Sequence, residues 1–191
     1  MTSTPAKTAP ADLVEQLRDV HPVGPGPMSF PASVRFAQLQ GERLATLAHD
    51  LLSVRDLLRL TPELEIRLDP SMPVPSASQF NAATGKWQIL LNSSEPADRQ
   101  DYELVYEFKR ILDARDTGLL YDPSEPVGSV QQFICASYFA RVALMPEIDV
   151  RRSVAHGLKS LPALAKAHDT WIEAARLRVS DLDLAGFIPI D

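Results

Sequence analysis

Side chains that could do chemistry gather in one stretch of this sequence, Arg99–Asp113. Its apolar residues recur with the period of an α-helix, and Glu103, Tyr106, Glu107 and Arg110 share the face beside them. A zinc-binding helix of the form H-E-x-x-H has histidines at positions i and i+4, which hold one zinc ion while the glutamate between them acts as general base toward bound water. Here Tyr106 and Arg110 occupy the two histidine positions, and Glu107 alone remains.

The same face also has a simpler interpretation. Glu107 and Arg110 are three residues apart, a spacing at which helix side chains form surface ion pairs, and Tyr106 would then lie along the arginine stem with nothing catalytic taking place. The alternative is a helix that has lost its catalytic residues. The choice between the two depends on the elements around the helix.

Composition limits both the size of the fold and its partners. The chain has 191 residues, 45% of them hydrophobic, which is enough for one sizeable core but does not require two full domains. Its net charge of -6 provides no global attraction for nucleic acid or anionic lipid, so we expect no direct nucleic-acid binding and no membrane association. An N-terminus without an apolar run and a single cysteine, Cys135, favour a cytoplasmic protein.

The first 32 residues differ in composition from the rest of the chain. They are rich in proline and glycine, and only Ala11–Val20 has apolar residues placed for a short helix. Such composition buries little surface, so we interpret residues 1–32 as a flexible arm. Residues 33–191 then form one domain.

That domain has the pattern of an α+β fold. Residues 30–60 are helical, with an apolar stripe, and residues 64–69, 76–81 and 86–91 read as strands of a small, mostly antiparallel sheet. The central helix at 99–113 is followed by a helix over 130–145, in which Cys135 reads as an inert small hydrophobe, and by short C-terminal helices. The stripe in the first helical region comprises Leu44, Leu47, Leu51, Val54 and Leu58.

Several strings resemble the ImmA/IrrE family of zinc metallopeptidases. The segment Ile89-Leu-Leu-Asn92, followed by Glu95-Pro96 and the helix Arg99–Arg110, is similar without a gap to the family's strand, loop and R-x-R-F-T-L-A-H-E-L-G-H helix. Ala136–Pro146 is similar to its A-N-x-F-A-x-x-L-L-M-P helix, which is the more specific match. The end, Trp171–Ile188, resembles the family's closing helical segment. The resemblance implies a small sheet packed on a zincin-like helical core with extra C-terminal helices.

The family's functional positions fall on residues that do not bind zinc. The resemblance puts the two histidines at Tyr106 and Arg110, the general base at Glu107, the acidic third ligand at Gln132 or Phe133, and a supporting Asn or Asp at Ser137. Tyrosine binds zinc poorly at neutral pH, arginine repels a cation, and neither Gln nor Phe replaces a carboxylate. We therefore expect no metal and no other cofactor, with Glu107 a vestige. The former metal-site positions are Tyr106, Arg110, Gln132, Phe133 and Ser137.

Three functional hypotheses follow. The first is a catalytically inactive pseudopeptidase that acts by binding; the resemblance implies a bacterial protein paired with a helix-turn-helix transcriptional regulator, or a toxin–antitoxin-like partner. The second is a metallopeptidase with displaced ligands, using His156 or His168 with Glu103 or Glu107. The third is a DNA-associated interaction module that uses C-terminal arginines, namely Arg141, Arg151, Arg152, Arg176 and Arg178.

Overall fold

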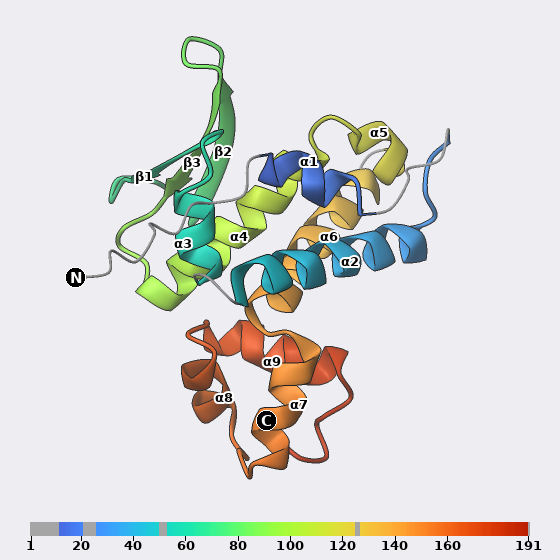
Figure 1. Ribbon diagram of the computed structural model, residues 1–191, viewed down its shortest axis with the longest axis vertical. Helices are drawn as coiled ribbons and strands as arrows, with labels where there is room; N and C mark the ends of the chain where they lie inside the picture. Colours follow the sequence, from blue (N-terminus) through green and yellow to red (C-terminus); the bar gives the residue numbers. More distant parts are fainter. Residues whose placement is uncertain (1–11, 21–25, 50–52, 125–126, 191) are drawn as a thin grey trace, which may run out of the picture.

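A computed structural model describes residues 12–20, 26–49, 53–124 and 127–190. A small sheet and a larger set of helices make up an α+β fold, which confirms the predicted fold class (Figure 1). The strands are β1 (Leu64–Leu68), β2 (Ser76–Asn81) and β3 (Lys86–Leu91). The helices are α1 (Leu13–Arg18), α2 (Phe30–His49), α3 (Val54–Arg59), α4 (Ala97–Asp113), α5 (Thr117–Leu120), α6 (Val127–Leu144), α7 (Glu147–Ala155), α8 (Leu161–Ala167) and α9 (Ile172–Asp181). None of the helices in these ranges has both the length and the apolar content of a membrane span.

The sheet is mixed rather than mostly antiparallel. Strand order is β1-β3-β2, with β2 antiparallel to β3 and β1 parallel to it. The predicted hairpin joins β2 to β3 through a turn at residues 82–85, in which Gly85 adopts a positive φ of 68°. The loop at 69–75 carries the chain from the end of β1 past β3 to the far edge, and that crossover makes the β1–β3 pair parallel.

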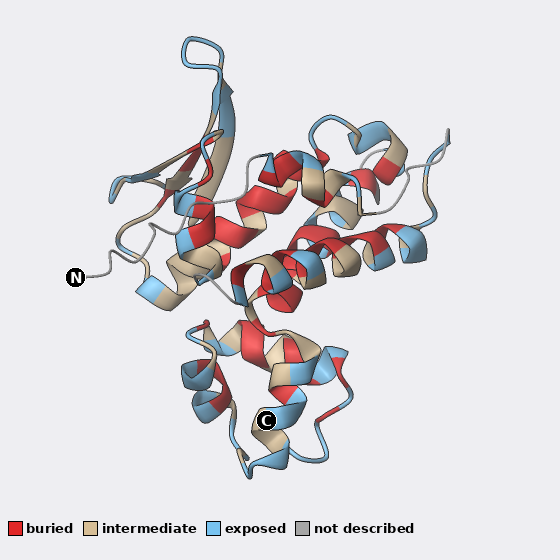
Figure 2. Cartoon of the chain, viewed as in Figure 1, coloured by how far each residue is buried: buried red, intermediate tan, exposed pale blue. Residues whose placement is uncertain are grey.

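Helix α4 is the centre of the fold. Its predicted apolar face is fully buried, with Leu104, Phe108 and Ile111 at most 1% exposed, and the helix packs against the sheet on one side and α6 on the other (Figure 2). Helix α2 packs along α6 so closely that a Cβ built on Gly41 would lie 2.9 Å from the Val142 Cβ. Glycine at this position therefore permits the close approach of α2 and α6.

The apolar stripe of residues 44–58 belongs to two helices. Leu44 and Leu58 are fully buried, whereas Leu47 and Val54 are partly buried against the core. Leu51 lies outside the described residues. The predicted core-facing role holds for the four described positions.

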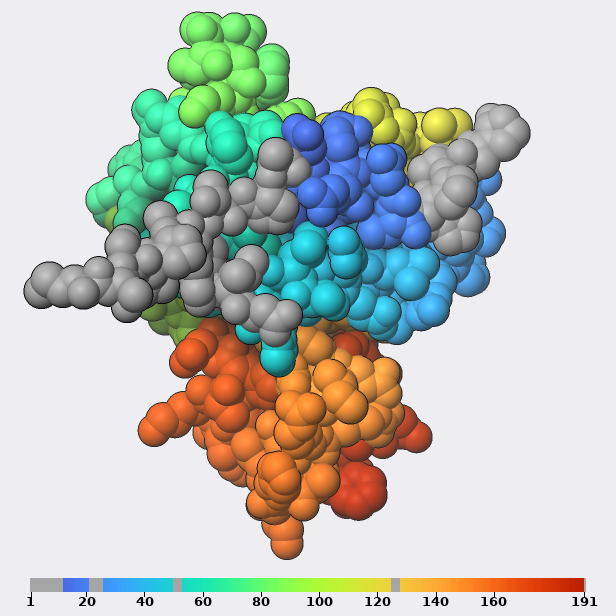
Figure 3. All heavy atoms as spheres, viewed as in Figure 1, coloured from blue at the N-terminus to red at the C-terminus, as the bar shows by residue number. Residues whose placement is uncertain are grey.

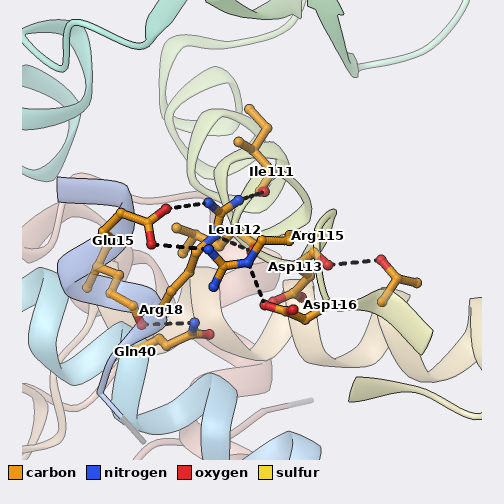
Figure 4. Close-up of polar contacts among 10 residues, drawn as sticks. Glu15, Arg18, Gln40, Ile111, Leu112, Asp113, Arg115 and Asp116 are labelled. Atoms are coloured by element: carbon orange, nitrogen blue, oxygen red, sulfur yellow. Dashed lines mark hydrogen bonds and ion pairs between the residues drawn. The ribbon is translucent and has the colours of Figure 1, made fainter. Parts of the chain in front are cut away.

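The described residues of the proline-rich segment correct the expectation of a flexible arm. Helix α1 places Leu13 and Leu17 in the core, each 0% exposed. Arg18 donates hydrogen bonds to the carbonyl oxygens of Leu112 at 3.0 Å and Ile111 at 3.2 Å, which are acceptors at the end of α4 (Figure 4). The last four carbonyl groups of a helix lack intrahelical partners and attract such donors, so this short helix docks despite the surrounding prolines. Residues 1–11 and 21–25 of the predicted arm lie outside the described residues.

The C-terminal helices form a distinct lobe. Helices α7, α8 and α9 lie beyond the end of α6, and appear in orange and red below the rest of the molecule in Figure 3. Ile188 and Val179 are fully buried in the same hydrophobic core cluster that contains Phe108. This lobe corresponds to the short C-terminal helices expected from the sequence.

Candidate functional site

One cavity of about 500 Å³ contains most of the predicted site residues. Tyr106, Glu107 and Arg110 reach it from α4, and Phe133 and Ser137 reach it from α6. Residues 106 and 110, and residues 133 and 137, are each four apart and so share one face of their helix. The other lining residues come from the start of β2, from α4 and from the α9 region: Pro75, Ser76, Arg99, Tyr102, Glu103, Trp171, Glu173 and Leu177.

Gln132 does not belong to this cavity. It lines a different pocket with Tyr121 and Asp122, because adjacent residues of a helix point about 100° apart. The sequence left open whether position 132 or 133 corresponds to the third ligand. Of the two, only Phe133 faces Tyr106, at a ring-centroid distance of 6.1 Å.

Glu107 is buried and fully hydrogen-bonded. The side chain accepts hydrogen bonds from the Ser76 hydroxyl at 3.0 Å and from the Ser78 hydroxyl at 2.6 Å. Arg110 forms an ion pair with it, with the guanidinium 3.1 Å from Oε2, although Arg110 itself is partly exposed. Glu107 as a whole is only 1% exposed, so the ion pair that we expected at the surface has a buried carboxylate. Both carboxylate oxygens are thus engaged by protein donors.

Glu103 shares the same serine but has fewer partners. The Ser76 hydroxyl lies 2.8 Å from Glu103 Oε2 as well as 3.0 Å from Glu107 Oε1. The nearest cation to Glu103, Arg99, is 3.8 Å away and pairs more closely with Glu95, at 3.1 Å. Burial raises the pKa of Glu103 above its usual value.

Tyr106 and Phe133 form an aromatic wall on the α6 side. Burial raises the pKa of Tyr106 to about 12, so its phenol is protonated at neutral pH. Phe133 packs edge-on against that ring, and its own side chain is 59% exposed. A protonated phenol and a phenyl ring are not metal ligands at neutral pH.

Ser137 belongs to a buried polar chain behind the cavity. Its hydroxyl lies 2.7 Å from the Tyr102 hydroxyl and accepts a hydrogen bond from Arg141 at 2.8 Å. Arg141 in turn forms an ion pair with Asp181 at 2.8 Å. Burial raises the pKa of Tyr102 as well. Ser137 therefore connects α4 to α9 through polar contacts and does not point a carboxylate or amide at the cavity.

Sequence reasoning did not identify the serines of β2 or the tryptophan at the cavity rim. Ser76 and Ser78 alternate along β2, and the period of two was the available signal that both face the same way. The Trp171 ring lies under the Arg99 guanidinium at 4.8 Å and edge-on to the Tyr102 ring at 5.9 Å. No sequence signal pairs Trp171 with a helix some seventy residues earlier.

The residues around the cavity do not fit a zinc ion. Across the described ranges, no group of three His, Cys, Asp or Glu side chains is placed to hold a metal. His168 lines another pocket, with Asp101 and Asp169, and His156 is an exposed residue that ends α7. Burial raises the pKa of Cys135 to about 11, so that thiol stays protonated and unreactive.

Comparisons with known proteins establish similarity of fold only. No family model matches the sequence, and no curated protein matches it. Among solved structures, a Mycobacterium tuberculosis transcriptional regulator has a TM-score of 0.56 to this chain at 14% sequence identity. The match covers 87% of this chain and 52% of the regulator, so this chain spans about half the length of that protein. At that identity, the likeness describes the fold and not the activity.

Proposed function

We propose that this chain is a catalytically inactive relative of the ImmA/IrrE zinc metallopeptidases that regulates a protein partner by binding it. The observation that carries the proposal is the state of Glu107. A general base needs a lone pair directed at the water that it deprotonates. Both Glu107 oxygens instead accept hydrogen bonds from Ser76, Ser78 or Arg110, and Glu107 itself is 1% exposed.

The geometry of the surrounding positions supports descent from a metal site. Four positions that the resemblance assigns to the former site, Tyr106, Arg110, Phe133 and Ser137, line one cavity together with Glu107. A set of metal ligands from α4 and α6 would have to converge in this way. The side chains now present are a neutral phenol, a cation, a phenyl ring and a hydroxyl, which replace ligand chemistry with packing and an internal ion pair.

Transcription regulation is the process that we propose for the partner. Helix-turn-helix regulators are the partners implied by the ImmA/IrrE resemblance, and the fold neighbour bears the name of a transcriptional regulator. That name belongs to a longer protein, of which the match covers 52%. It supports a regulatory context, and a helix-turn-helix protein encoded in a neighbouring reading frame is the first partner to test by co-purification.

The two alternative functions have less support. A displaced zinc site would need His156 or His168 near Glu103 or Glu107, but His168 lines a pocket separate from the one containing the two glutamates. A DNA-associated module would need arginines that are free to bind phosphate. The candidate arginines instead pair with nearby acids or are buried: Arg141 with Asp181, Arg151 with Glu147, Arg152 with Asp149, Arg176 with Glu173, and Arg178 with the Met145 carbonyl.

Restoring the ligands tests the proposal. The triple variant Tyr106→His, Arg110→His, Phe133→Glu should bind one zinc per chain, because it returns two histidines at i and i+4 and a carboxylate to the same cavity. In the matched control, Gln132→Glu replaces Phe133→Glu, which puts the carboxylate in the other pocket. We expect the control to bind zinc at least about tenfold more weakly by calorimetry.

Two outcomes would contradict the proposal. If the triple variant folds, as judged by circular dichroism, yet retains no zinc, the cavity does not have the geometry of a metal site. If the control binds zinc as tightly as the triple variant, position 133 has no special relation to positions 106 and 110.

A further inference from the structure

Helix α6 is apolar on two opposite faces. Its sequence contains no charged residue before Arg141. The inner face, with Cys135 and Phe139, is fully buried in the core. On the outer face Val130, Phe133 and Ile134 are 53%, 59% and 37% exposed. A helix that is apolar on opposite faces is normally covered on both. The outer face of α6 has the apolar composition of a buried surface, but it is exposed to solvent.

These three residues form a ridge that leads into the candidate site. Val130, Phe133 and Ile134 are spaced i, i+3 and i+4, so they lie on one side of α6, and we call them the α6 ridge. Phe133 belongs to the ridge and also lines the cavity, where it contacts Tyr106. A segment lying on the ridge would therefore reach the cavity without leaving the protein surface.

The cavity beside the ridge has an excess of negative charge at Glu103. One hydroxyl, that of Ser76, is shared between Glu103 and Glu107, and a hydroxyl has only one proton to donate. Glu107 has Arg110 and Ser78 in addition, whereas the closest cation to Glu103 is Arg99, at 3.8 Å. Glu103 is thus the carboxylate of the pair with the longer ion pair, 3.8 Å to Arg99 against 3.1 Å from Glu107 to Arg110.

We propose that the α6 ridge and the cavity together bind one segment of a protein partner, with apolar side chains on the ridge and a lysine or arginine side chain directed at Glu103. This inference rests on the proposed function as a binding protein and specifies the chemistry of the partner. The cation would approach beside the Tyr106 and Phe133 rings, whose faces favour positive charge. One such segment would cover the exposed apolar side chains of the α6 ridge and also place a cation beside the Glu103 carboxylate.

Charge disfavours a second copy of this chain as the occupant. Two copies that docked by the same face would bring two Glu103 cavities toward each other, and the like charges would repel. A partner segment of opposite charge has no such cost. The choice of occupant follows from charge complementarity between the carboxylate pair and a basic, apolar segment.

The inference is tested by selecting peptides against the full chain. The probe is a phage-displayed library of random 16-residue peptides, selected on immobilised wild-type protein. Recovered sequences should combine aliphatic or aromatic residues with lysine or arginine. Their affinity should fall at least about tenfold for Phe133→Ser and for Glu103→Gln, as expected for central contacts. The matched control is Ile148→Ser, at a 66% exposed apolar residue of α7, which should leave peptide affinity unchanged.

Several results of this selection would overturn the inference. Recovery of acidic sequences, of no binding sequence, or of peptides as sensitive to Ile148→Ser as to Phe133→Ser would overturn the inference. So would a wild-type dimer, measured by light scattering, that Phe133→Ser converts to a monomer, since the ridge would then belong to a second copy. Zinc content is measured on the same preparation: one zinc per chain removes the proposed function, whereas a zinc-free chain without peptide preference removes only this inference.

Discussion

Lys109 and Asp113 form an ion pair inside the core, and breaking it should destabilise the protein strongly. Both residues are 0% exposed, and the Lys109 ammonium lies 2.5 Å from Asp113 Oδ1. The Tyr121 hydroxyl donates to the other carboxylate oxygen at 2.5 Å, and the Phe36 ring lies 5.3 Å from the ammonium. Lys109→Met would leave the Asp113 carboxylate with the Tyr121 hydroxyl as its remaining side-chain partner at a position that water does not reach.

The size of the effect follows from the desolvation of the stranded carboxylate. Removing one member of a buried pair costs about 3–5 kcal/mol, because the other charge stays buried without compensation. For a chain of 191 residues this corresponds to a fall of roughly 10 °C in Tm. Urea denaturation followed by circular dichroism would measure the free energy of unfolding.

The double variant Lys109→Met, Asp113→Leu provides the control. It removes both charges, so the remaining cost is the unpaired Tyr121 hydroxyl, about 1–3 kcal/mol, offset in part by new apolar packing. The double variant should therefore be more stable than Lys109→Met alone. A single variant that loses less than about 1 kcal/mol, or a double variant no more stable than the single, would refute the assigned role of this pair.

Three further predictions concern packing, capping and charge. Gly41→Ala should lower the free energy of unfolding by about 1–3 kcal/mol because its Cβ would overlap α6, whereas Gly118→Ala, with nothing within 4 Å, should not destabilise in the same urea assay. Arg18→Ala should cost about 1–3 kcal/mol, since α4 loses two charge-assisted hydrogen bonds to its last carbonyls; an unchanged urea midpoint would contradict the docking of α1. The pKa of Glu103 is raised in the folded state, so its ionised form costs stability as pH rises above the ordinary value of 4.5. Glu103→Gln should thus raise Tm at pH 8 but not at pH 4, and an equal change at both would reject that assignment.

Elements defined by local periodicity were predictable from the sequence. The apolar positions of α4 and the alternation in β1 each follow from a period that a few neighbouring residues display. The parallel pairing of β1 with β3 was not predictable in that way, because it depends on how the loop at 69–75 crosses the sheet. Helix α1 was identified as a possible short helix, but its docking depends on Arg18 meeting the end of α4, a contact between residues more than ninety positions apart.

The candidate site was predictable in part. Glu103, Tyr106, Glu107 and Arg110 share a helix face by spacing alone, and the cavity contains all four. Their burial was not predictable, since Ser76 and Ser78 come from a separate strand. The Lys109–Asp113 pair shows the same limit: at i and i+4 on a helix, such charges normally indicate a solvated face, and only packing by distant helices places them in the core.

Zinc binding by the wild-type chain distinguishes an inactive relative of the metallopeptidases from an active one. The purified protein is incubated with excess zinc, exchanged into volatile buffer and analysed by native mass spectrometry. We expect the mass of the chain alone, because Tyr106 is protonated, Arg110 is cationic and Glu107 accepts hydrogen bonds from protein donors. One retained zinc per chain, lost on Glu107→Ala, would contradict this expectation.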